Sequence, residues 1–79
     1  MKITLKVPKS AVSSREGRLV EWYVDDGATV EAGAPIYAIE LEKAALDIEA
    51  PFRGVVRHLA TVDEVYAVGD PIAELTRQD

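Results

Sequence analysis

The chain has 79 residues, a formal net charge of −5 at pH 7 and no cysteine. This length fits one small domain, residues 1–79, and excludes a large active-site cleft or a whole metabolic enzyme. The lack of cysteine excludes disulfides and thiolate zinc sites. The acidic balance argues against a nucleic-acid or anionic-membrane surface. No apolar run could span a membrane and no secretory signal is recognisable, so we expect a monomeric cytoplasmic domain.

Short apolar and β-branched runs, separated by glycine, proline and aspartate, predict strands along the whole chain. The expected strands cover residues 3–7, 19–24, 36–41, 46–48, 55–59 and 72–75. Residues 40–49 could pass for a short helix, but their strand-like flanks and Pro51 favour a hairpin that turns near 42–43. Short strands at this spacing are typical of a sandwich or barrel.

An internal repeat divides the chain into two similar halves. The segment 33–36, Gly-Ala-Pro-Ile, returns as Gly-Asp-Pro-Ile at 69–72, which is 36 residues later. Gly17 recurs as Gly54 at an offset of 37. Two copies are too few for a solenoid. We therefore predict an all-β fold, a flattened β-barrel or sandwich of two antiparallel sheets with pseudo-two-fold symmetry and a hairpin tip on the symmetry seam.

The expected core consists of large aliphatic side chains in the predicted strands and at their ends. They are Leu19, Val24, Val30, Ile36, Ile39, Ile48, Val56, Val68, Ile72 and Leu75. The neighbours of Trp22 are compatible with a buried or a partly exposed ring, and the sequence does not decide between them.

The residues of common catalytic sites do not form a recognisable set. The serines nearest a usable pattern, Ser10, Ser13 and Ser14, lie in one N-terminal stretch, and His58 sits inside a strand pattern. A histidine there is more often a satisfied strand residue than a general base. No phosphate-binding glycine loop or metal-ligand spacing is present. Intrinsic enzyme activity is therefore the function we expect least.

Lys43 is the one lysine after residue 9, and it falls at the predicted hairpin tip. An amine at such a tip is accessible to a modifying enzyme. Nearby carboxylates such as Glu40 and Glu42 favour its charged form, which makes Lys43 a poor nucleophile by itself. On these local features alone, a solvated turn lysine is the favoured interpretation.

Five ordered segments give this lysine a different meaning. They are EGRLVEW at 16–22, DGATVEAGAPI at 26–36, IELEKA at 39–44, IEAPFRGVV at 48–56 and VGDPIA at 68–73. With these segments the chain resembles the lipoyl domains of 2-oxo acid dehydrogenase acyltransferases from about residue 8 to residue 75. The resemblance implies a non-catalytic carrier domain with lipoate attached covalently to Lys43. It would carry acyl groups and electrons between the active sites of a 2-oxo acid or acetoin-type dehydrogenase complex.

The resemblance also assigns recognition residues around the attachment site. Glu40 and Gly27 lie three and sixteen residues before Lys43, and the family uses these positions for recognition by modifying or partner enzymes. Glu42 and Ala44 flank the lysine where related biotinyl domains have methionine, so lipoate is preferred to biotin. The implied partners are a lipoate ligase or lipoyl transferase, the 2-oxo acid dehydrogenase and dihydrolipoamide dehydrogenase.

Three positions differ from the family pattern. Leu41 replaces the usual Thr or Ser, Glu42 replaces Asp, and Asp63 stands where glycine is usual, so we expect the turn at 62–65 to differ in shape. An apolar residue beside the tip would alter recognition or make a different contact. Two alternatives stay open: an unmodified lipoyl-like module used for binding or structure, and a biotinyl carrier.

Overall fold

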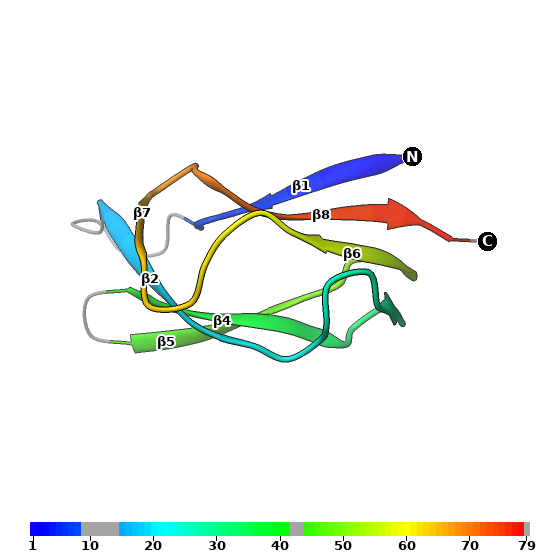
Figure 1. Ribbon diagram of the computed structural model, residues 1–79, viewed down its shortest axis with the longest axis horizontal. Helices are drawn as coiled ribbons and strands as arrows, with labels where there is room; N and C mark the ends of the chain where they lie inside the picture. Colours follow the sequence, from blue (N-terminus) through cyan, green and yellow to red (C-terminus); the bar gives the residue numbers. More distant parts are fainter. Residues whose placement is uncertain (9–14, 42–43, 79) are drawn as a thin grey trace.

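The computed structural model describes residues 1–8, 15–41 and 44–78, and the regular elements in this part of the chain are β-strands (Figure 1). The strands are β1 (Lys2–Lys6), β2 (Glu16–Trp22), β3 (Thr29–Val30), β4 (Pro35–Leu41), β5 (Ala44–Glu49), β6 (Gly54–His58), β7 (Val65–Ala67) and β8 (Pro71–Arg77). The six strands expected from the sequence are confirmed, and β3 and β7 are additional. Among the described residues, none forms a helix long and apolar enough to cross a membrane.

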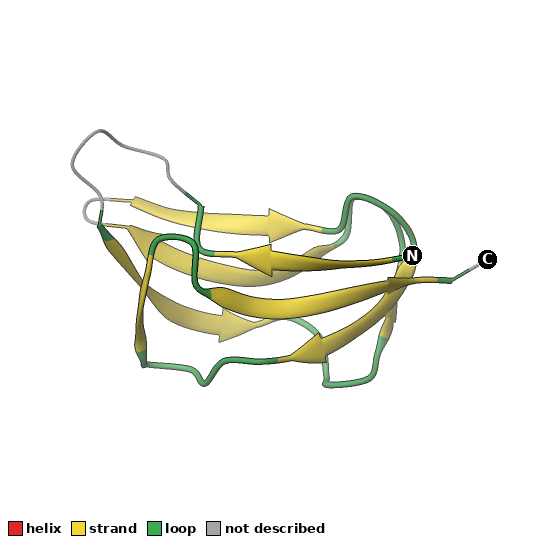
Figure 2. Ribbon diagram, turned by 90° about the horizontal axis from the view of Figure 1, so that it is seen from above, coloured by secondary structure: helices red, strands yellow, loops and turns green. Residues whose placement is uncertain are grey.

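The strands form two four-stranded sheets that face each other as a sandwich (Figures 1 and 2). The first sheet has the order β1-β8-β6-β3, and the second has the order β5-β4-β2-β7. All neighbouring strands in both sheets are antiparallel. The predicted all-β architecture of two antiparallel sheets is therefore confirmed.

The strand order contains the pseudo-two-fold symmetry. Exchanging each strand with the one four places away in the sequence converts the order of the first sheet into that of the second. Backbone hydrogen bonds repeat in the same way: Gly33 N–H donates to the Ala50 carbonyl at 2.7 Å, and Gly69 N–H donates to the Val7 carbonyl at 3.0 Å. Each sheet takes two strands from each half of the chain, so neither half completes a sheet alone.

The core lies between the sheets and is formed by apolar side chains from both halves. Its buried members are Val7, Leu19, Val30, Ile36, Tyr37, Ala38, Ile39, Leu41, Ala50, Val56, Ile72, Ala73 and Leu75. Three expected members, Val24, Ile48 and Val68, are only partly buried. Ile48 lies on the edge strand β5, and the two valines lie in loops beyond strand ends, so solvent reaches each of them.

The turn before β7 keeps the backbone conformation and hydrogen bond of its counterpart in the first half of the chain, so no difference in shape from that counterpart accompanies Asp63. Asp63 has a φ of 74°, and Gly27, at the equivalent place in the first half, has a φ of 89°. Asp63 N–H donates to the Leu19 carbonyl at 2.8 Å, just as Gly27 N–H donates to the Val56 carbonyl at 2.7 Å. Aspartate is one of the few residues besides glycine that enters this left-handed region, so the turn is preserved without glycine.

Candidate functional site

The β4–β5 hairpin carries the predicted attachment site. Its ladder pairs Glu40 with Ala45 and then Leu41 with Ala44. Glu42 and Lys43 connect these two strands and lie outside the described residues. The ends of β4 and β5 that adjoin this connection lie at the opposite end of the molecule from the two termini (Figure 1). The register of the described residues thus leaves two residues, Glu42 and Lys43, between the paired ends of β4 and β5.

Leu41 fixes the base of this hairpin from inside the core. Its side chain is buried, and its Cδ2 lies so close to Gly17 on β2 that a Cβ there would stand 2.8 Å away. Gly17 is itself buried and provides the space that this leucine fills. The departure from the family pattern at Leu41 is therefore a packing feature and not an exposed contact.

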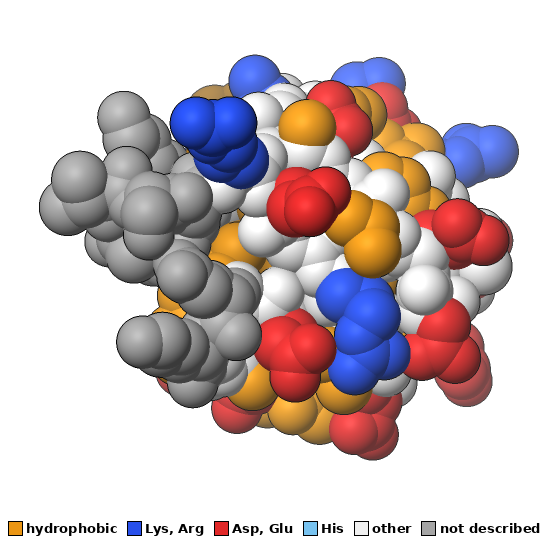
Figure 3. All heavy atoms as spheres, turned by 90° about the vertical axis from the view of Figure 1, so that its left-hand side faces the viewer, with side chains coloured by type: hydrophobic (Ala, Val, Ile, Leu, Met, Phe, Trp, Pro, Cys, Tyr) orange, Lys and Arg blue, Asp and Glu red, His pale blue; other side chains and the backbone are white. Residues whose placement is uncertain are grey.

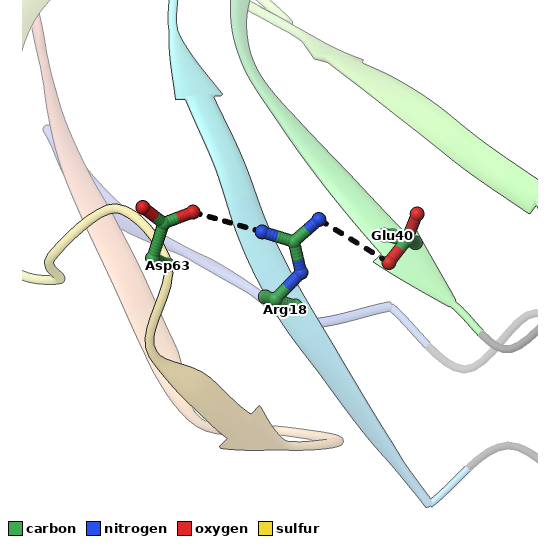
Figure 4. Close-up of polar contacts among 3 residues, drawn as sticks. All are labelled: Arg18, Glu40 and Asp63. Carbon is green, nitrogen blue, oxygen red and sulfur yellow. Dashed lines mark hydrogen bonds and ion pairs between the residues drawn. The ribbon is translucent and has the colours of Figure 1, made fainter.

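Glu40 lies on the outer face of the second sheet in an ionic cluster that the sequence did not reveal. The guanidinium of Arg18 donates from Nη2 to Glu40 Oε1 at 3.4 Å and from Nη1 to Asp63 Oδ1 at 2.8 Å (Figure 4). We call these three residues the Arg18 cluster. The register places Arg18 between Glu40 on β4 and Val65 on β7. Only the register between the strands shows that these side chains meet, and the pattern of residues along the sequence does not contain that register.

The other predicted recognition residues do not all lie near Glu40. Ala44 begins β5 and is exposed beside the hairpin connection. Gly27 lies in the β2–β3 loop, hydrogen-bonded to Val56 in the first sheet, and Figure 1 shows this loop toward the end where the termini lie. Gly27 and Glu40 therefore do not form one contact surface, and Gly27 can influence recognition only through a separate surface or through the fold.

The hairpin end of the molecule has a mixed surface. Figure 3 views this end and shows carboxylates, basic side chains and apolar side chains interspersed on it. Val65, beside Arg18, is 54% exposed. Within the described ranges, no group of three or more metal-ligating side chains comes together.

His58 is a satisfied strand residue, as expected. It lies at the end of β6, and its Nε2–H donates to the Val24 carbonyl at 2.9 Å. Its ring stacks on Trp22, whose Nε1–H donates to the Ala60 carbonyl at 3.3 Å. Both rings are therefore structural, and the ring of Trp22 is partly buried.

Comparison with known proteins shows the family to which the chain belongs. A family model for biotin and lipoyl attachment, described as "Biotin-requiring enzyme", matches residues 3–75. The chain belongs to the biotin/lipoyl attachment family. A component of the acetoin cleaving system of Pseudomonas putida, the dihydrolipoyllysine-residue acetyltransferase, is 37% identical to this biotin/lipoyl domain over 71 residues. That match covers 89% of this chain and 19% of the acetyltransferase.

Other relatives of the domain include dihydrolipoyllysine acyltransferases and acyl-CoA carboxylases. The pyruvate dehydrogenase acetyltransferase component of Zymomonas mobilis is 33% identical over 75 residues, which is 92% of this chain and 17% of that protein. The acetyl-CoA carboxylase of Dictyostelium discoideum is 35% identical over 72 residues, which is 91% of this chain and 3% of that protein. A solved structure of a single-chain, multi-domain long-chain acyl-CoA carboxylase matches with a TM-score of 0.78 and 26% identity, over 99% of this chain and 7% of that chain. The chain thus spans less than a fifth of each of these relatives.

Proposed function

We propose that this biotin/lipoyl domain is a lipoyl carrier modified on Lys43. The observation that carries this proposal is the β4–β5 ladder, which ends with Leu41 opposite Ala44 and so leaves Lys43 in a two-residue connection. A lipoyl group on a lysine in such a turn is a tether that starts from a fixed point and raises the local concentration of the acyl carrier at a partner's active site. The cofactor supplies the bond chemistry, and the domain itself performs no catalysis.

The proposed partners follow from the relatives and from the carrier role. The lipoyl group would receive an acyl group and electrons at a 2-oxo acid or acetoin-type dehydrogenase, pass on the acyl group and be reoxidised by dihydrolipoamide dehydrogenase. The acetyltransferases of the acetoin and pyruvate systems support this assignment. A lipoate ligase or lipoyl transferase would attach the cofactor, in the cytoplasm.

Biotin is the second candidate cofactor, because both a sequence relative and a structural relative are acyl-CoA carboxylases. The sequence around the lysine favours lipoate, since Glu42 and Ala44 stand where the biotinyl family has methionine. A third candidate, an unmodified structural module, rested partly on Leu41. The burial of Leu41 accounts for that residue without a new function.

Intact mass spectrometry tests the proposal. The chain is co-expressed with a lipoate ligase and lipoate, and in parallel with a biotin ligase and biotin. We expect one lipoyl group per chain, lost in Lys43→Arg and retained in Lys2→Arg. Lys2 is an exposed lysine that lies far from Lys43 in the sequence. A biotin adduct on Lys43 without a lipoyl adduct would establish the second candidate. No adduct on a chain that circular dichroism shows to be folded would establish the third.

A further inference from the structure

The Arg18 cluster joins three separate segments of the chain. Arg18 comes from the middle of β2, Glu40 from β4 and Asp63 from the turn before β7 (Figure 4). Their side chains keep 39%, 49% and 77% of their surface exposed. One guanidinium is thus shared between two carboxylates that lie within reach of a docking protein.

The backbone conformation at Asp63 is one that glycine adopts more easily than aspartate. Its φ of 74° disfavours a side chain, and the equivalent turn uses Gly27. The Asp63 carboxylate makes the shorter of the two contacts with Arg18, at 2.8 Å. Exposed ion pairs contribute little to stability, so the free energy of folding does not explain the presence of aspartate at this turn.

The position of Glu40 indicates that the Arg18 cluster orients the Glu40 carboxylate. Glu40 lies three residues before Lys43 on the strand that leads into the hairpin connection. Arg18 engages its Oε1, whereas its Oε2 has no polar contact among the described residues. The cross-strand neighbours on either side, Ala45 next to Glu40 and Val65 next to Arg18, have short apolar side chains that leave the carboxylate accessible.

We infer that Arg18, anchored by Asp63, is a positioning residue that holds the Glu40 carboxylate so that its second oxygen accepts a hydrogen bond from a basic side chain of the lipoylating enzyme. The inference rests on the proposed function and names the contact by which the lipoylating enzyme recognises the attachment site. Restraining Glu40 before docking removes part of the side-chain entropy that binding would otherwise lose.

Steady-state lipoylation kinetics of the intact chain test this role. We expect Glu40→Gln and Arg18→Met to raise KM about two- to fivefold with little change in kcat, because an exposed ion pair is worth up to about fivefold in affinity. Methionine keeps the aliphatic stem of Arg18 and removes only the guanidinium. Arg18→Lys should raise KM less than Arg18→Met, because the ammonium can still pair with one carboxylate. It does not restore the KM of the unaltered chain, because a single ammonium cannot bridge both carboxylates as the planar guanidinium does.

Asp63→Gly separates positioning from folding. Glycine relieves the left-handed backbone, so the melting temperature rises or stays constant, while the loss of the anchor raises KM about two- to threefold. The matched control for Arg18→Met is Arg53→Met, which removes an arginine paired with Glu31 at 2.9 Å in the β5–β6 loop. Both arginine variants lose one positive charge, and Arg53→Met leaves KM unaltered.

Scalar couplings of the Glu40 side chain provide a second readout that needs no partner. Couplings between Hα and Hβ report one dominant rotamer in the unaltered chain and averaged rotamers in Arg18→Met. A KM for Arg18→Met equal to that of Arg53→Met, or lower than that of the unaltered chain, overturns the inference and leaves the proposed function intact. A chain that gains no lipoyl group at all overturns the proposed function and this inference with it.

Discussion

Trp22 and His58 stack face to face, with ring centroids 3.6 Å apart and planes 11° from parallel. The two residues are 36 positions apart, so they occupy equivalent places in the two halves of the repeat. Their hydrogen bonds are equivalent as well: Trp22 reaches the Ala60 carbonyl, and His58 reaches the Val24 carbonyl, which is again 36 positions away from its counterpart. The pseudo-two-fold axis therefore passes close to an aromatic pair that joins the two halves.

Removal of one ring should weaken this junction measurably. We expect His58→Ala to lower the free energy of unfolding by about 1–3 kcal/mol, because it removes the stack and leaves the Val24 carbonyl without its ring partner. Trp22 is the one tryptophan of the chain, so its fluorescence reports the change directly, and its emission should move to longer wavelength. Urea unfolding followed by this fluorescence measures both effects.

His58→Phe separates the contribution of the ring stack from that of the hydrogen bond to Val24. Phenylalanine keeps a ring against Trp22 but cannot donate to Val24, so its loss of stability should lie between those of the unaltered chain and His58→Ala. Arg57→Ala, at an exposed neighbouring position on β6, is the control. Equal stability of all four proteins would contradict a joining role for the pair.

The aromatic pair also shows where sequence reasoning reached its limit. The repeat predicted the symmetry, and the offset of 36 relates β4 to β8 residue for residue. The place of Trp22 stayed undecided because it depends on His58, which is distant in the sequence. The strands β3 and β7 were missed because two and three residues are too few to show a period of two.

The Arg18 cluster was hidden for a related reason. Arg18 faces Glu40 only because of the register between β2 and β4, and that register shifts at a bulge between Leu19 and Glu21. Asp63 joins the cluster from a turn whose conformation the sequence suggested would change. Composition and periodicity predicted the sheets, but cross-strand contacts on the outer face depend on the register between strands, which neither of them contains.

The two symmetry-related glycines provide a second prediction. A Cβ on Gly54 would overlap the backbone carbonyl oxygen of Thr76, whereas a Cβ on Gly17 would first meet the movable Cδ2 of Leu41 at 2.8 Å. Backbone in the middle of a sheet cannot shift as easily as a side-chain terminus. We therefore expect Gly54→Ala to lower the free energy of unfolding by about 2–3 kcal/mol and Gly17→Ala by less. Chemical denaturation of both variants measures the difference, and the reverse order would contradict this account.

The turn at Gly27 yields a third prediction. Its φ of 89° favours glycine, although a side chain would meet no atom within 4 Å. Gly27→Ser should therefore lower the free energy of unfolding by about 1 kcal/mol through backbone strain alone. Gly27→Asp should lower it less, because Asp63 adopts this conformation in the equivalent turn. Thermal unfolding compares the two variants, and equal melting temperatures would argue against the equivalence of the turns.

Recognition through Gly27 is tested on the same pair of variants. If Gly27 acts only through the shape of its turn, lipoylation rates should follow the fraction of folded protein. A Gly27→Asp chain that is as stable as the unaltered chain but poorly lipoylated would instead indicate a direct contact at this loop.

The last prediction concerns alkaline pH and the buried Tyr37. Burial raises the pKa of Tyr37 well above its usual value of 10.0. Above about pH 10, the unfolded chain therefore releases a proton that the folded chain keeps, and stability falls as the pH rises. One such group gives a slope of about 1.4 kcal/mol per pH unit until the folded protein also ionises. Urea unfolding between about pH 8 and pH 11 should show this decline.

Tyr37→Phe identifies the group responsible. This variant should lose about 1 kcal/mol at neutral pH, because the Tyr37 hydroxyl donates to the Lys6 carbonyl at 3.2 Å, and its stability should then depend less on alkaline pH. The hydrogen bond to Asp47 and the nearby charge also raise the pKa of Tyr23, but this side chain is exposed. Tyr23→Phe should therefore flatten the decline less than Tyr37→Phe. A slope that survives in Tyr37→Phe would show that another group controls the alkaline transition.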